Sequence, residues 1–221
     1  MTCKSIEVRI NNEGRLVTKQ DVRDIIEGSK ITGVGKPLDE ERLKKLRGLL
    51  ETKSYMKDLL LYATGDSVLH VEFKQRIPAI RVAGDRGAWY YIDSELHVFP
   101  ASMRYAYDVP VVTGQVQLPP KGKIPEKETV FVEKLLEFAT FVASSPFWNA
   151  QIQQIHIDGK QNVEFTVTSE RHLIRLGQLD GYRRKMEGLL AFYRKVNSYT
   201  GDSYRILDLR FENQIIAVKN V

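Results

Sequence analysis

Histidine, cysteine and paired carboxylate side chains are the residues of this 221-residue chain that could bind a metal or catalyse a reaction. Its four histidines, His70, His97, His156 and His172, occur singly and lack the His-x-x-x-His or Cys spacing of a zinc site. The single cysteine, Cys3, stands at the N-terminus, away from the sheltered basic surroundings that activate a thiol. The sequence therefore predicts no metal and no cofactor.

Catalytic motifs are also missing from the sequence. Asp93 and Glu95 are two residues apart and would share one face of a strand, but a polar turn explains this pair more simply. Phosphate-binding loops, dinucleotide fingerprints and nucleophile elbows do not occur. We therefore expect a binding protein that is not an enzyme. The alternative is an enzyme with an unrecognised site, which a buried cluster of titratable groups in a pocket would indicate.

The net charge of +5 raises the question of an anionic partner. The basic excess is spread along the chain, and its densest cluster, Arg183-Arg184-Lys185, falls on a predicted helix. No stacking aromatics or glycine-rich loop accompany this cluster, so it fits a solvated helix face better than a phosphate-binding patch. We expect no nucleic-acid partner, and salt-dependent binding to DNA or RNA would support that alternative.

Local patterns in the first 75 residues predict a strand, two helices and two strands in that order. Alternating Ile6, Val8 and Ile10 are typical of a half-buried strand. Thr18 with Asp21 resembles a helix-capping pair. Two amphipathic helices over a three-stranded sheet form a two-layer unit. The expected elements are a strand at 4–10, helices beginning near Thr18 and Asp39, and strands at 56–64 and 68–75.

The composition changes at residues 83–87, which we interpret as a domain junction, and the rest of the chain is richer in strands. Asp158-Gly159 favours a type I′ hairpin turn. The expected elements are strands at 89–92, 97–99, 109–112, 151–157, 162–168, 171–176, 204–211 and 214–219, and helices at 127–144 and 182–196. The fold class is thus expected to be α+β, with a β-α-α-β-β domain at 4–80 and a mostly antiparallel β domain with two packed helices at 83–221.

Several segments resemble one known family in the order in which the family has them. Residues 71–78, Val-Glu-Phe-Lys-Gln-Arg-Ile-Pro, resemble the last strand of the POTRA domain of FtsQ/DivIB cell-division proteins. Residues 90–100 and 109–114 resemble the opening hairpin of that family's second domain and the segment that follows it. Near the C-terminus, Leu207-Asp208-Leu209-Arg210-Phe211 is similar to the family's terminal Asp-Leu-Arg-aromatic strand.

This resemblance implies a non-enzymatic scaffold of the divisome at the division septum. Its POTRA domain would dock other division proteins, and its second domain would bind FtsB/DivIC and, through it, FtsL. The family also implies a periplasmic or extracytoplasmic position and one N-terminal inner-membrane helix. No apolar run here approaches the roughly 20 residues that span a bilayer. We therefore expect that anchor to precede this sequence.

The resemblance further places the partner-binding site on the C-terminal strands, because an exposed edge strand can accept a partner strand. Aromatic and arginine side chains are the types most enriched at interface hot spots, which favours Arg210 and Phe211. The opposite interpretation makes Phe211 a core residue and Arg210 a solvated one. The expected partner-binding residues are Tyr204, Ile206, Asp208, Arg210, Phe211, Asn213 and Gln214.

Another POTRA-bearing protein, such as a membrane-protein assembly or secretion factor, is the alternative. Proteins of that kind usually carry repeated POTRA units or a membrane barrel. The strand-helix-helix-strand-strand pattern occurs once in this sequence, which disfavours the alternative.

Overall fold

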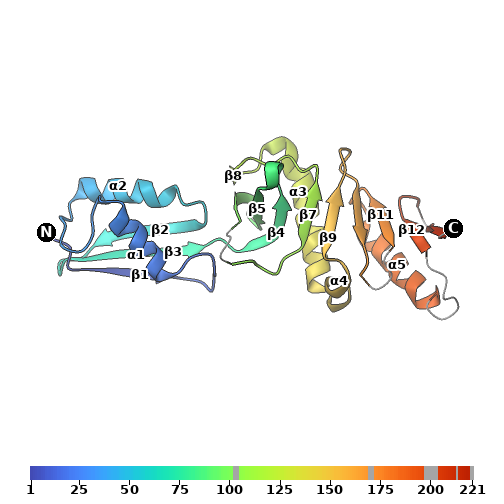
Figure 1. The fold of residues 1–221 in the computed structure, drawn as a ribbon, viewed down its shortest axis with the longest axis horizontal. Helices are drawn as coiled ribbons and strands as arrows, with labels where there is room; N and C mark the ends of the chain where they lie inside the picture. Colours follow the sequence, from blue (N-terminus) through green and yellow to red (C-terminus); the bar gives the residue numbers. More distant parts are fainter. Residues whose placement is uncertain (102–104, 169–171, 197–203, 213, 220–221) are drawn as a thin grey trace. The chain divides into compact units, whose positions relative to one another are not determined.

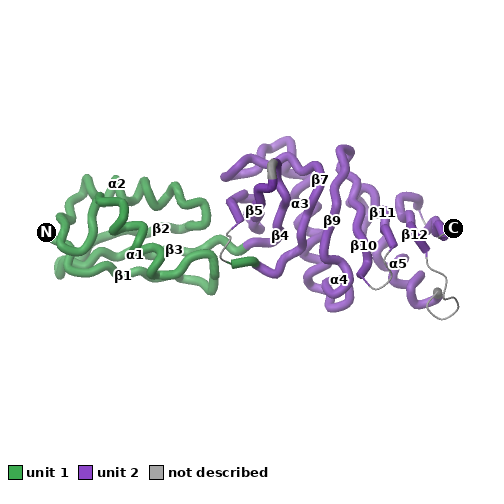
Figure 2. Tube along the Cα trace, in the orientation of Figure 1, with its two compact units in different colours: residues 1–77, 102–106 green, residues 78–101, 107–221 purple. Residues whose placement is uncertain are grey.

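The computed structural model describes residues 1–101, 105–168, 172–196, 204–212 and 214–219. The chain forms two compact units, one of residues 1–77 and 102–106 and one of residues 78–101 and 107–221 (Figure 2). The division between them falls at Ile77 and Pro78, a few residues before the junction expected at 83–87. Each unit has a hydrophobic core of its own.

The first unit is a three-stranded sheet with two helices against it (Figure 1). The strand order is β1-β3-β2, with β1 parallel to β3 and β2 antiparallel to it. This is the predicted β-α-α-β-β order. The elements are β1 (Ser5–Ile10), α1 (Lys19–Gly28), α2 (Glu40–Glu51), β2 (Met56–Ala63) and β3 (Val68–Gln75).

Capping side chains fix where the two helices begin. Thr18 and Asp21 form the predicted capping box at α1, in which each side chain accepts a hydrogen bond from the other's backbone N–H. The Asp39 carboxylate accepts from the Arg42 N–H at 2.9 Å and caps α2. Both helices then turn their apolar stripes toward the sheet, where Val22 and Leu46 are fully buried.

The second unit is built on a ten-stranded, mostly antiparallel sheet of order β13-β12-β11-β10-β9-β7-β4-β5-β6-β8. Three of its neighbouring pairs are parallel: β4 with β7, β7 with β9, and β11 with β12. The strands are β4 (Pro78–Ala83), β5 (Trp89–Asp93), β6 (His97–Pro100), β7 (Val111–Gly114), β8 (Gly122–Lys123), β9 (Gln154–Ile157), β10 (Val163–Thr166), β11 (Leu173–Gly177), β12 (Tyr204–Asp208) and β13 (Ile216–Lys219).

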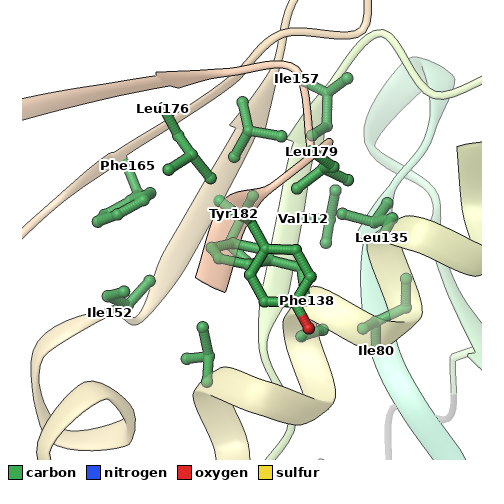
Figure 3. Packing of buried hydrophobic residues seen from close by; sticks show 14 of the residues in the cluster. Ile80, Val112, Leu135, Phe138, Ile152, Ile157, Phe165, Leu176, Leu179 and Tyr182 are labelled. Atoms are coloured by element: carbon green, nitrogen blue, oxygen red, sulfur yellow. The ribbon is translucent and has the colours of Figure 1, made fainter. Parts of the chain in front are cut away.

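Three helices, α3 (Glu126–Ser144), α4 (Pro146–Gln151) and α5 (Tyr182–Val196), contribute to the core of this unit (Figure 1). Phe138 of α3 meets the Tyr182 ring edge to face at a centroid distance of 5.3 Å (Figure 3). Ile80, Val112 and other strand residues close the same cluster from the sheet side. The helices therefore cover one face of the sheet.

The opposite face is covered locally at β4 to β6 by the segment that follows Ala106. Tyr91 and Phe99 lie on this face, fully buried, with ring centroids 5.7 Å apart. The Tyr107 ring meets Tyr91 edge to face, and the Tyr91 hydroxyl accepts the Tyr107 N–H at 3.2 Å. The remaining strands, including those at the C-terminus, have no such cover among the described residues.

Four sequence predictions need correction. Pro78–Ala83 is a strand of the second sheet, because it pairs with β5 and β7. The second unit has a third helix, α4, which ends at Gln151, the residue where the strand at 151–157 was expected to begin. The turn after β9 is not type I′, since Gln161 holds the positive φ of 60° and the Asp158 carboxylate accepts the Asn162 N–H. The last two strands are both shorter than expected. β12 ends at Asp208 instead of residue 211, and β13 begins at Ile216 instead of residue 214.

No helix in the described ranges combines the length and the apolar character needed to cross a membrane.

Candidate functional site

The C-terminal strands end the large sheet. β12 lies between β11, to which it is parallel, and β13, to which it is antiparallel, so β12 is an interior strand. β13 pairs only with β12 among the described strands and leaves its other side open. The edge expected near the chain end is therefore Ile216–Lys219, whereas the strand with the family motif is buried one position inside it.

Alternation along β13 directs apolar side chains to the open face. Ala217 packs against the core on the helix side, so Ile216 and Val218 point away from it and are 43% and 37% exposed. Val218 is paired with Ile206 of β12, and Ile206 with Leu173 of β11. We call these four residues, Leu173, Ile206, Ile216 and Val218, the edge patch.

A row of charged side chains borders the edge patch. Arg175 lies directly opposite Asp208 on one side and binds Glu164 on the other, with its Nε 3.1 Å from Oε1. The buried Asp208 carboxylate accepts the Arg210 Nε at 2.9 Å and the Arg210 backbone N–H at 3.1 Å. The side-chain hydrogen bond from Arg210 holds the pKa of Asp208 below its usual value, and Asp208 in turn raises the pKa of Arg210.

The Arg210 side chain packs directly against the backbone of Gly177. Gly177 has a φ of 75°, which favours glycine, and a Cβ built there would lie 2.8 Å from the Arg210 Cγ. Arg210 belongs to the turn after β12, but its side chain packs against Gly177 at the end of β11 and hydrogen-bonds to Asp208. The same turn carries Phe211, which is 50% exposed.

The predicted site residues therefore have different environments. Ile206 belongs to the edge patch, and Phe211 and Gln214 are exposed, but Tyr204 turns toward the helix side, where its ring lies 5.6 Å from that of Phe192. An irregularity of the β12 register between Tyr204 and Ile206 accounts for this orientation. Asn213 lies outside the described residues.

The sequence prediction did not include Leu173, Ile216 and Val218. A signal existed, because residues 215–218 are all apolar, and a strand with one buried face needs apolar residues only at alternate positions. An apolar run on a short terminal strand indicates that its second face is also in use.

The first unit offers a separate surface on β2, which ends the order β1-β3-β2. Leu60 and Tyr62 of β2 are exposed there, and the Tyr62 hydroxyl donates to Glu72 Oε1 at 3.0 Å. The hydrogen bond to Glu72 raises the pKa of Tyr62. Glu72 also pairs with Arg9 of β1 at 3.3 Å, so this polar network joins all three strands.

His70, His156 and His172 make local side-chain contacts. His70 stacks on Tyr62, and the His172 Nε2 lies 2.6 Å from the Tyr193 hydroxyl in a buried pair. His156 lies 3.2 Å from the Thr113 hydroxyl. Within the described ranges, no three His, Cys, Asp or Glu residues gather in a way that could hold a metal ion.

Comparison with protein families gives two matches. A family model described as FtsQ/DivIB, C-terminal related, matches residues 77–218, and a model described as POTRA-like domain matches residues 1–74. The two matched ranges meet where the two units divide. No curated protein matches the chain. The resemblance stated from the sequence is therefore confirmed at the level of the family.

Proposed function

The chain belongs to the FtsQ/DivIB C-terminal related family and carries an N-terminal POTRA-like domain, and from this membership we propose that it is a non-enzymatic scaffold of bacterial cell division. Its partners are division proteins of the FtsB/DivIC and FtsL type, which bind to the second unit. The POTRA-like unit docks other division proteins. The whole protein is held at the septum by one N-terminal membrane helix and works on the extracytoplasmic side of the inner membrane.

The observation that carries this proposal is the open edge of β13 beside the edge patch. An edge strand presents backbone N–H and C=O groups that another strand can pair, and this gives affinity without requiring a particular sequence. Ile216 and Val218 stand next to those groups and offer apolar surface to alternate side chains of the added strand. The position therefore supplies both parts of strand addition, backbone pairing and side-chain selection.

Phe211 and the Asp208–Arg210 pair give the edge its selectivity in this proposal. The exposed Phe211 ring offers a large rigid surface to a partner aromatic or aliphatic side chain. Arg210 is already held by Asp208, so a partner carboxylate would meet a guanidinium whose position is fixed before binding. An added strand that continues past β13 with an acidic residue near Arg210 would use both.

The test titrates the extracytoplasmic part of an FtsB/DivIC-type partner into four folded variants, Val218→Glu, Phe211→Ala, Arg210→Glu and the control Val130→Glu. Val130 of α3 is also exposed and apolar but lies on a helix away from the edge. We expect Val218→Glu, and at least one of the two turn variants, to weaken binding by about 2 kcal/mol, the size of a hot-spot effect. The control should bind like the parent. Unchanged affinity in all three edge variants would remove this site.

A further inference from the structure

The second unit has a groove that the proposed partner site does not use. It has a volume of about 720 Å³ and runs between α3 and the turn that joins β5 to β6. Ala79, Leu96, Leu136 and Phe141 give it an apolar floor, and Glu133 and Glu137 stand on its rim. None of these residues belongs to β11, β12 or β13.

Leu96 occupies an unusual backbone position on the floor of this groove. Its φ of 60° lies in the left-handed region, where the Cβ of a leucine crowds the backbone and where glycine or asparagine is normal. The turn is fixed by Asp93, whose carboxylate accepts the N–H groups of Glu95 and His97. The Leu96 side chain is partly buried against the core of the second unit, and the part of it that stays uncovered lines the groove.

The groove has acidic side chains near one end of its α3 wall and a basic side chain near the other. Glu133 and Glu137 are one helical turn apart, both are exposed, and neither has an ion-pair partner in the described part of the chain. The nearby Lys134 does not neutralise them, because its Nζ binds Asp180 at 2.6 Å. Two turns after Glu133 on α3, the Phe141 ring centroid lies 5.3 Å from the guanidinium of Arg183, a residue of α5 that also lines the groove.

We propose that this groove docks an amphipathic helix of a partner protein, basic in its N-terminal half and acidic near its C-terminus. Lysines or arginines four residues apart on such a helix match the one-turn spacing of Glu133 and Glu137. Apolar side chains of its buried stripe fill the space above Leu96 and Phe141. The acidic end lies against Arg183, and this direction also places the helix dipole favourably, with its positive end at the glutamates.

Two synthetic 18-residue peptides of identical composition test the proposal on the full 221-residue chain. One has leucines along one face, lysines in the N-terminal half and glutamates in the last turn, and the other has the lysines and glutamates exchanged. Binding is followed by amide and methyl chemical shifts. We expect the first peptide to shift the signals of Leu96, Leu136 and Phe141 and to bind at least tenfold more tightly than the exchanged peptide.

Variants separate the charge and apolar contributions. Glu133→Lys combined with Glu137→Lys should reverse the preference between the two peptides, whereas Glu51→Lys, an exposed helix glutamate of the first unit, should leave it unchanged. Leu96→Asn suits the left-handed backbone, so we expect a thermal midpoint within about 4 °C of the parent together with weaker peptide binding. Equal binding of both peptides, shifts that centre elsewhere, or no shifts at millimolar peptide would each overturn the proposal.

Discussion

Asp208 is a family-motif residue whose part in this chain is to hold the turn that follows it. Its carboxylate accepts four hydrogen bonds from Arg210: one from the backbone N–H, two from the Nε–H, which is shared between both carboxylate oxygens, and one from Nη2. Because Arg210 rests on Gly177, the ion pair also ties the turn to β11. The Asp208 carboxylate thereby stabilises the turn that leads from β12 toward β13.

We predict that Asp208→Asn lowers the free energy of unfolding of the second unit by about 1 kcal/mol at pH 7, a value reduced by the exposure of Arg210. The folded-state pKa of Asp208 is depressed, so its stabilisation is present above the ordinary aspartate pKa of about 3.9 and is lost as the pH falls below it. Urea unfolding at pH 7 and pH 3 measures this. A difference between parent and variant that stays the same at pH 3 would contradict the assignment, and the exposed Asp108→Asn serves as control.

Gln75 plays a comparable part in the first unit. Its fully buried side-chain amide accepts the Leu16 N–H at 2.8 Å and the Val17 N–H at 3.0 Å, and it donates to the carbonyls of Gly14 and Val17. Gly14 must be small, since a Cβ there would lie 2.5 Å from the Gln75 Cβ. One side chain thus satisfies the backbone of the loop between β1 and α1.

We predict that Gln75→Leu destabilises the first unit by about 3 kcal/mol or more, because it leaves several buried backbone groups without partners. Denaturation by urea, followed by far-ultraviolet circular dichroism, measures the change. Gln20→Leu is the matched control, since Gln20 is exposed and bonds only to Asp24 in the described structure. If both variants unfold alike, the Gln75 network does not stabilise the loop.

At the scale of elements, the position of a strand in its sheet decides what it can do. β12 carries the family motif but is paired on both sides, and β13 carries no motif but is open. The helices also depend on what they pack against. The leucine stripe of α2 lies in the core of the first unit, and its burial stabilises the helix. Leu46 and Leu50 of that stripe are fully buried, while Leu43 and Leu49 are partly buried.

We predict that Leu46→Asp unfolds the first unit, because an unpaired carboxylate buried there costs about 3 kcal/mol or more, a large share of the stability of a small domain. Circular dichroism during heating should show the loss. Leu60→Asp on β2 is the control, since Leu60 is 56% exposed and should tolerate the charge. A Leu46→Asp protein that melts like the parent would refute the assignment of this residue to the core.

At the scale of the whole molecule, the two cores share no buried residue. The core of the first unit draws on residues up to Phe73, and that of the second begins at Ile80. Both tryptophans, Trp89 and Trp148, belong to the second unit. Each unit therefore has its own source of cooperativity, and tryptophan fluorescence reports on the second one alone.

We predict that Leu46→Asp leaves the urea midpoint measured by tryptophan fluorescence at the parental value, because the second unit retains all of its buried contacts. Part of the circular dichroism signal should already be lost before urea is added, because the first unit is unfolded. A fluorescence midpoint that moves with the variant would show that the two units unfold as one cooperative body.

Local sequence determined much of this protein. Alternation, the Thr18–Asp21 capping box and the tight turn after β2 depend on residues near one another, and they correctly indicated every element of the first unit. The family motifs are equally local, which is why the sequence alone led to the FtsQ/DivIB resemblance that the family match confirms. Gly65, Asp66 and Ser67 needed no tertiary contact to mark a turn.

Tertiary structure decided which strands are neighbours, and with that the site. The sequence places the end of the first domain at residue 80, yet Pro78–Ala83 forms an interior strand of the second sheet because β5 and β7 pair with it on its two sides. Tyr204 turns inward at a register irregularity that only its pairing with β13 creates. The edge patch joins residues from three strands. Strand pairing brings together residues distant in sequence, and no local pattern specifies which strand remains at the edge.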